Sequence, residues 1–119
     1  MAREFKRSER VADLIQEVIG ELLVHSIKDP RLEMVTVTGV KVSGDLRHAT
    51  VYYTAHGTAE RQTEALAGFQ SAAGFLRSYL RKETALKFIP ELRFRYDKSL
   101  DEGEKIDRLL REVHRGDDD

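Results

Sequence analysis

A long amphipathic stripe near the N-terminus is the feature that most limits what this chain can fold into. Apolar residues recur there at i, i+3, i+4, i+7 and i+8, which is the spacing of one face of an α-helix. We predict a helix that begins at Ser8, as its N-cap, and ends near Ile27, because Pro30 disfavours helical backbone at Asp29. A helix with one apolar face needs a second layer to cover that face. The stripe consists of Val11, Leu14, Ile15, Val18, Ile19, Leu22 and Leu23.

Two β-strands are predicted after this helix. Alternating apolar residues change parity at Gly39, which indicates a β-bulge inside one strand over residues 33–43. Turn residues at 43–45 then lead into a second alternating run at 49–55. Together these segments predict an antiparallel hairpin.

The helical period returns after Thr58, and its apolar side runs from Leu66 to Leu80. Gly74 lies inside this pattern, and a glycine in a helix interior costs about 0.8–1.0 kcal/mol relative to alanine. Either one long helix tolerates Gly74 or two helices meet there at a bend, and the small residues at 71–73 favour the bend. Backbone exposed at such a bend would let a ligand approach closely.

A third strand and a last helix complete the predicted order of elements. Pro90 opens a strand in which apolar residues alternate over 92–96, and Ser99 to Glu102 forms a capping box for a helix. Three strands cannot cover both faces of their own sheet, so the helices should lie on one face. We therefore predict an α+β fold with two layers.

No catalytic constellation is found in the sequence. The absence of cysteine excludes disulfides, thiolate nucleophiles and cysteine-ligated metals. The P-loop, dinucleotide-binding, H-E-x-x-H and G-x-S-x-G motifs are also missing. We expect no enzymatic activity, no metal, no cofactor and no small-molecule substrate. The four histidines, which share no metal-ligand spacing, are His25, His48, His56 and His114.

The apolar runs are all shorter than the ~20 residues of a membrane helix, and the N-terminus lacks the apolar stretch of a signal peptide. We therefore expect a cytoplasmic protein that has no contact with membranes.

Charge is distributed unevenly along the chain. The formal net charge is −1, yet residues 1–10 carry +2, residues 72–98 carry +4 and residues 99–119 carry −4. A near-neutral total is therefore compatible with a local basic surface that faces an anion.

The basic block contains a pattern suited to phosphate. If a helix restarts near Ala73, Arg77 and Arg81 lie one turn apart beyond it. Free N–H groups at such a helix N-terminus favour an anion, and guanidinium groups add charge-assisted hydrogen bonds. This arrangement favours binding to nucleic acid.

The order of elements resembles a type II KH domain, in which a helix-turn-helix with a G-x-x-G loop clamps single-stranded nucleic acid. This chain lacks G-x-x-G. Its Ala72-Ala73-Gly74 is instead similar to the Ala-x-Gly interruption, a helix-kink-helix, of the bacterial ribosome-binding factor A family. The resemblance covers about residues 3–112. Matching strings in the same order are Arg10–Ala12, Ile27–Leu32, Asp45–Tyr52, Gly74–Ser78, Pro90–Phe94 and Tyr96–Leu100.

This resemblance implies a non-enzymatic assembly factor of the small ribosomal subunit. It implies binding to the immature subunit and its rRNA late in maturation, near the neck, where rRNA ends are processed, with most importance in the cold. We expect a monomer with a flexible basic segment at 1–7, one KH-like RNA-binding domain at 8–114 and an acidic disordered tail at 115–119. The expected RNA-binding residues are Lys6, Arg7, Arg10, Lys28, Arg31, Ala72, Ala73, Gly74, Arg77, Arg81 and Lys82.

Two alternatives stay open at this point. The segment Asp29-Pro30-Arg31 fits a helix stop and turn as well as it fits an RNA contact. The chain could also be a protein-interaction module whose helix faces and open sheet bind a protein. Arg93 and Arg95 alternate with core residues, and we expect them to be solvated on the open face of the sheet.

Overall fold

The computed structural model describes residues 2–99 and 110, with side chains from Lys6 onward. Its elements follow the predicted order of helix, two strands, helix and strand. A short 3-10 helix, η1, lies between the first helix and the first strand. The elements are α1 (Ala2–His25), η1 (Pro30–Leu32), β1 (Val35–Val42), β2 (His48–Ala55), α2 (Ala59–Glu83) and β3 (Glu91–Tyr96).

The three strands form one sheet in the order β1-β2-β3. β1 is antiparallel to β2, and a register shift just before Gly39 confirms the predicted bulge. β3 is parallel to β2. Main-chain hydrogen bonds extend this parallel pairing at both ends, from Glu91 N to Arg47 O (2.8 Å) and from Asp97 N to Tyr53 O (2.7 Å).

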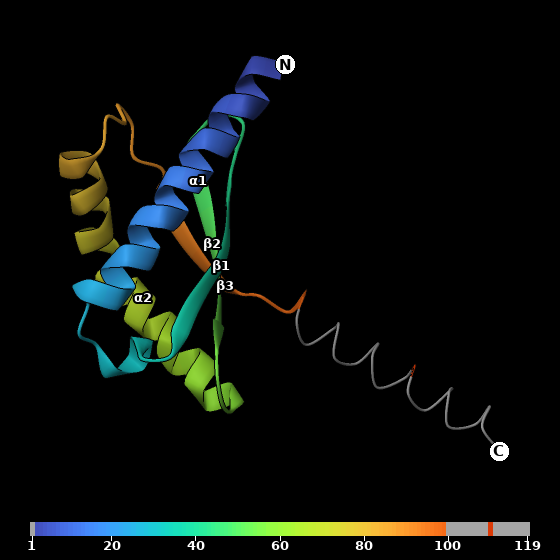
Figure 1. The fold of residues 1–119 in the computed structure, drawn as a ribbon, viewed down its shortest axis with the longest axis vertical. Coiled ribbons are helices and arrows are strands. Elements are labelled where there is room, and N and C mark those ends of the chain that lie inside the picture. The colour runs from blue at the N-terminus through green and yellow to red at the C-terminus, as the bar shows by residue number, and fades with distance from the viewer. Residues whose placement is uncertain (1, 100–109, 111–119) are drawn as a thin grey trace.

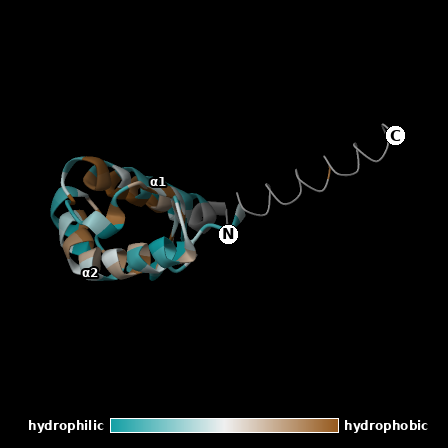
Figure 2. Ribbon diagram, turned by 90° about the horizontal axis from the view of Figure 1, so that it is seen from below, coloured by the Kyte–Doolittle hydropathy of each residue, from teal (hydrophilic) through white to brown (hydrophobic). Residues whose placement is uncertain are grey.

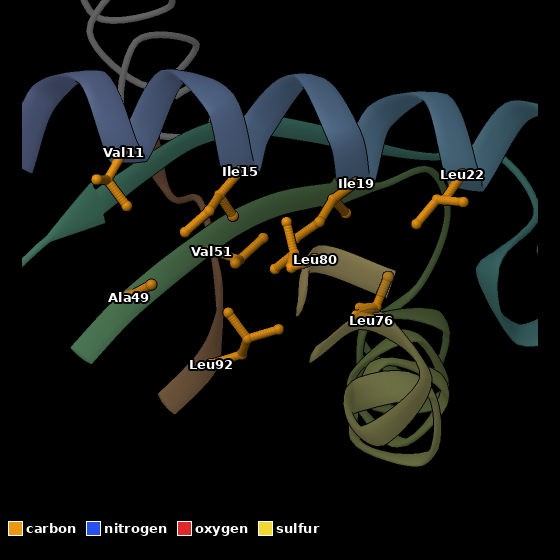
Figure 3. Packing of buried hydrophobic residues seen from close by; sticks show 9 residues of the cluster. All are labelled: Val11, Ile15, Ile19, Leu22, Ala49, Val51, Leu76, Leu80 and Leu92. Carbon is orange, nitrogen blue, oxygen red and sulfur yellow. The ribbon is translucent and has the colours of Figure 1, made fainter. Parts of the chain in front are cut away.

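Both helices pack on the same face of the sheet, as predicted for a two-layer α+β fold (Figure 1). Both helices contain polar and apolar residues along their whole length, as expected of amphipathic helices (Figure 2). The main core joins α1, α2, β2 and β3, and Ile19 and Leu22 belong to it as expected (Figure 3). A second cluster contains Leu32, Tyr53, Ala55, Ala65 and Phe69.

The first helix begins six residues earlier than predicted, at Ala2. Ser8 is therefore not an N-cap but a helical residue, and it is only 7% exposed. It lies two turns into the helix and lines a small hollow with Ala12 and Val42 of the sheet. Since residues 2–7 contain neither glycine nor proline, no local feature stops the helix at Ser8. The flexibility expected of residues 1–7 stays a prediction.

The second helix is continuous through Gly74. Its axis changes direction about halfway along, so it is kinked, but it is not interrupted (Figure 1). The expectation that a helix restarts near Ala73 is wrong, because the buried residues Phe69, Leu76 and Leu80 keep one helical phase across the glycine. Helix α2 consequently offers no free N-terminal N–H groups to an anion at this point.

The predicted capping box at Ser99–Glu102, the last helix and the tail at 115–119 lie outside the described residues, apart from Ser99 itself and Leu110.

Candidate nucleic-acid interface

The exposed side of α2 presents small residues followed by cations. Ser71, Gly74 and Ser78 are exposed and recur at helical spacing, and Arg81 and Lys82 follow them in the last turn. No atom of the described part of the chain lies within 4 Å of the point where a β-carbon would sit at Gly74. We call this side of α2 the helix surface. It leaves the helix backbone accessible over two turns and places positive charge one turn further on.

An aromatic pair borders the helix surface. The Phe75 side chain, 51% exposed, lies next to Tyr79, with ring centroids 6.3 Å apart. The sequence pattern predicts both rings on the apolar side of the helix. This is confirmed for Tyr79, which is half-buried and packs against the main core, but it is wrong for Phe75, which is exposed. A detectable signal existed, since Phe75 is one position out of phase with the stripe through Leu76 and Leu80. Exposed rings beside cations are suited to stacking with unpaired bases.

The two residues before Gly74 have small, apolar side chains. Ala72 and Ala73 are half-buried, and Ala72 packs against the main core. Their methyl groups add little bulk beside the helix surface. Of the predicted Ala72-Ala73-Gly74 motif, Gly74 is therefore the exposed member.

Arg77 and Arg81 are not equivalent, although one turn separates them. Arg81 is exposed, whereas Arg77 is half-buried and donates a hydrogen bond from Nη2 to the carbonyl oxygen of Ile89 (3.3 Å). Among the described residues, the buried Arg77 Nε has no hydrogen-bond partner. Arg77 thus links the segment before β3 to α2 through Nη2, and its Nε–H group is left as a further hydrogen-bond donor.

The structure brings Arg7 of α1 and Arg77 of α2 to one groove of about 550 Å³, where Arg47 also lies. Phe88, 80% exposed, lines this groove and the adjoining hollow, which Arg7 and Lys87 share. Two basic clusters that are far apart in sequence therefore meet at one end of the domain. The other residues that line the groove are Asp45, Leu46, Ile89 and Glu91.

Two further cations of α1 lie outside this groove. Lys6 and Arg10 are exposed and one helical turn apart. They extend the positive charge along the outer side of the helix.

Lys28 and Arg31 lie elsewhere. They belong to the segment between α1 and β1, away from the N-terminal end of α1 (Figure 1). The Arg31 guanidinium makes a two-pronged contact with Asp29, through Nη2 at 2.7 Å and Nε at 3.1 Å. These hydrogen bonds lower the pKa of Asp29 and raise the pKa of Arg31.

The geometry of this segment is that of a helix stop and turn. Asp29 caps η1 by accepting a hydrogen bond from Arg31 N (2.9 Å). Leu32 is buried, and η1 packs on α2 at Gly68, where a β-carbon would lie 2.9 Å from Leu32 Cγ. Arg31 is thus paired within the turn, while Lys28 is exposed.

Metal and membrane features were also sought in the described part of the chain. Within residues 2–99 and 110, no three histidine, aspartate or glutamate side chains are grouped so that they could hold a metal ion. None of the helices in this part is both long and apolar enough to span a membrane.

The two-layer fold and its single kinked helix define a KH-like α+β domain. A model of the ribosome-binding factor A family matches residues 7–110. Ribosome-binding factor A of Geobacter metallireducens is 50% identical over 109 residues, which cover 92% of each chain. The chain belongs to the ribosome-binding factor A family.

Solved structures show the same relationship. The solution NMR structure of a Thermotoga maritima protein assigned to ribosome binding factor A has a TM-score of 0.68 and 35% identity, covering 78% of this chain and 89% of that one. Thermus thermophilus ribosome binding factor A, as a homology model fitted into the cryo-electron-microscopy map of its complex with the 30S subunit, has a TM-score of 0.61 and 25% identity. That alignment covers 73% of this chain and 91% of the other.

Proposed function

We propose that this protein is a ribosome maturation factor that binds the rRNA of the immature small subunit. In this role it assists late assembly and processing of the rRNA 5′ end without catalysing a reaction. The helix surface carries the proposal, because an exposed glycine, an exposed aromatic ring and two exposed cations follow one another along α2. The small-subunit complex of the Thermus thermophilus relative supports this choice of partner.

The proposed mode of binding is recognition of shape. A G-x-x-G loop clamps backbone by opening a helix, whereas α2 is continuous at Gly74. We infer that folded rRNA lies against the small residues of the helix surface and that Arg81 and Lys82 contact its phosphates. The groove at Arg7 and Arg77 would accept neighbouring phosphates, and Lys6 and Arg10 would lengthen the contact.

A binding role agrees with the electrostatics of three hydrogen-bonded carboxyl groups. The pKa of Asp29 is lowered by hydrogen bonds from Arg31, that of Asp45 by the Ser43 hydroxyl, and that of Asp97 by Ser99. A general acid needs a pKa raised towards neutrality. These carboxylates therefore favour structural roles, and we propose a non-enzymatic monomer that acts in the cytoplasm.

A second candidate function is binding to a protein. Val24 and Met34 are 77% and 72% exposed and line a hollow of about 500 Å³ beside η1. Exposed apolar side chains around a hollow are typical of protein contacts. Salt separates the two functions, because phosphate contacts weaken steeply with salt and apolar contacts do not.

The test measures binding of the full chain to immature small subunits as a function of salt. Arg81→Ala/Lys82→Ala should weaken binding and reduce the salt slope by roughly 0.7–0.9 for each phosphate that the variant no longer neutralises. The matched control is Lys105→Ala/Arg108→Ala, which removes the same charge from the acidic stretch at 99–119. Equal affinity and equal slope in all three proteins would exclude the helix surface as the rRNA-binding surface.

A further inference from the structure

The face of the sheet opposite the helices is basic and carries an aromatic ring. Lys41, Arg93 and Arg95 are exposed there, one from β1 and two from β3. Tyr52 of β2 lies between them, half-buried. Neither α1 nor α2 packs on this face, which we call the sheet surface. The other strand residues on this face include the threonines Thr36, Thr38, Thr50 and Thr54, together with His48 and Glu91.

Strand register sets the spacing of these groups. Lys41 pairs with Thr50, which pairs with Arg93, so the three lie in one row across the sheet. Tyr52 and Arg95 pair in the next row along the strands. At ~3.3 Å per residue and ~4.8 Å between strands, Arg93 and Arg95 have Cα atoms about 6.6 Å apart, and Lys41 and Arg93 about 10 Å apart. Three cations thus surround one tyrosine ring.

A hollow of about 610 Å³ adjoins the ring at the β3 edge. Tyr52, Arg95 and Lys98 line it from the sheet surface, and Gln62 and Leu66 line it from α2. Its inner wall includes Tyr53, Phe94 and Tyr96, whose rings belong to a set of aromatic contacts in the core. The ring contacts are Tyr53–Phe69 (5.0 Å between centroids), Phe69–Phe94 (4.8 Å) and Tyr53–Tyr96 (6.0 Å).

Two carboxylates of the described residues, Glu91 and Asp97, lie near these cations. Glu91 Oε2 is 3.6 Å from Nδ1 of His48 at the start of β3, and the Glu91 side chain is exposed. Asp97 accepts hydrogen bonds from the hydroxyls of Thr38 (2.5 Å) and Ser99 (2.6 Å). Lys41 Nζ stands 5.8 Å from the centre of the Tyr52 ring and makes a cation–π contact. Lys41, Arg93, Arg95 and Lys98 outnumber these two carboxylates, so the sheet surface is net positive and complementary to an anion.

We propose that the sheet surface is a second RNA-binding surface, specific for an unpaired strand, with phosphates at Arg93 and Arg95 and one base in the hollow beside Tyr52. The ligand is single-stranded because stacking on an aromatic ring requires a base that has left its duplex. This inference rests on the proposed function only in that RNA is the ligand. It would let the domain hold folded rRNA on one side and a free rRNA strand on the other.

The experiment uses the full chain and a labelled single-stranded RNA of about ten nucleotides, with binding followed by fluorescence anisotropy at several salt concentrations. Arg93→Ala/Arg95→Ala should reduce the salt slope by about 1.4, at about 0.7 for each phosphate of a single strand. Tyr52→Ala should weaken binding about 5-fold or more, whereas Tyr52→Phe keeps the ring and should bind as the parent does. Glu91→Gln removes a negative charge from the same face and should tighten binding.

Two comparisons keep this inference separate from the proposed function. Lys105→Ala/Arg108→Ala removes two cations from the acidic stretch at 99–119 and should leave affinity for the strand unchanged. Arg81→Ala/Lys82→Ala should weaken binding to immature subunits more than binding to the strand. If the parent does not bind the strand, or if Arg93→Ala/Arg95→Ala binds it with unchanged affinity and slope, the sheet surface is not an RNA site. Such a result would leave the subunit measurement, and with it the proposed function, intact.

Discussion

Two glycines of one helix, Gly68 and Gly74, differ in almost every structural respect. Gly68 is buried under η1, and a β-carbon there would lie 2.9 Å from Leu32 Cγ and 3.2 Å from Arg31 Cβ. Gly74 is exposed, and a β-carbon there would have no neighbour within 4 Å in residues 2–99 and 110. The first glycine therefore serves packing inside the domain. The second leaves open the surface to which we assign rRNA.

This difference divides α2 into a half that packs against η1 and a half with exposed side chains. Around Gly68 the helix is in contact with η1 and with the aromatic cluster at Phe69. Beyond Gly74 it still buries Leu76 and Leu80, but its other side carries Phe75 and Arg81 outward. One part of a helix can thus stabilise the fold while the next part is available to bind a partner. Each of the following predictions tests one part of that division.

The largest effect is expected at Leu32, which covers Gly68. Leu32→Ala removes a buried side chain and should lower the free energy of unfolding by about 2–5 kcal/mol. Urea denaturation monitored by circular dichroism measures the change. A decrease below about 1 kcal/mol would show that η1 is not docked on α2 as the structure places it.

Gly68→Val should come next, with a destabilisation of about 1–3 kcal/mol, because the new side chain overlaps Leu32. Gly74→Val is the matched control, and it should change stability only by the small difference in helix propensity, which slightly favours valine over glycine. Gly68, and not Gly74, therefore occupies the packing site that is closed to a β-branched residue. Combining Gly68→Val with Leu32→Ala should destabilise by less than the sum of the two, since the second change makes room for the first.

Gly74→Ala should have opposite effects on stability and on binding. A helix-interior alanine should raise the free energy of unfolding by about 0.8–1.0 kcal/mol. The added methyl group should weaken binding to immature subunits, because it stands where rRNA is proposed to approach. Thermal unfolding and subunit co-sedimentation of the same preparation measure the two effects. An alanine variant that binds as tightly as the parent would remove Gly74 from the proposed interface.

Substitutions of Arg77 and Arg81 should differ in their effect on stability. Arg77→Ala removes the hydrogen bond to Ile89 O and should reduce stability by about 1 kcal/mol. Arg81→Ala should stay within about 0.5 kcal/mol of the parent, since its side chain is exposed. Both should weaken subunit binding. Equal stability of the two variants would contradict the fastening role of Arg77.

The smallest effect concerns acid stability of the turn at Asp29. Because hydrogen bonds from Arg31 hold the pKa of Asp29 below its ordinary value of 3.8, the ionised carboxylate stabilises the folded chain above about pH 4. That contribution should disappear as the pH falls through the lower, folded-state pKa. Asp29→Asn should therefore be less stable than the parent near neutrality and approach it in acid. Parallel unfolding curves at all pH values would show that the Asp29–Arg31 pair does not stabilise η1.

Several elements of the fold followed from local pattern alone. The apolar stripe from Val11 to Leu23 placed α1 on the sheet, and the parity change at Gly39 located the bulge in β1. The two-layer arrangement followed from having three strands and amphipathic helices. The predicted start of α1 was wrong because residues 2–7 are mostly charged yet permit a helix, and an apolar stripe locates only the part of a helix that is packed.

The candidate site was less predictable. Of the cations predicted to bind RNA, Lys6, Arg10, Arg81 and Lys82 are exposed, as contact with RNA would require. The hydrogen-bond partners of the other cations could not be predicted from the sequence. Arg31 is held by Asp29 and Arg77 by Ile89 O, and the groove that joins Arg7 to Arg77 depends on how two helices cross the sheet. The role of these residues in RNA binding remains a prediction.

The sequence by itself determined which elements form and which side of each is buried, because periodicity is a local property of neighbouring residues. Tertiary structure alone decided that β3 lies parallel beside β2, and so that Arg93, Arg95 and Tyr52 share one face. It also decided which glycine of α2 is covered, since Leu32 reaches Gly68 from 36 positions away in the chain. Contacts of this kind depend on the distance between segments in space, and no periodicity along the chain encodes that distance.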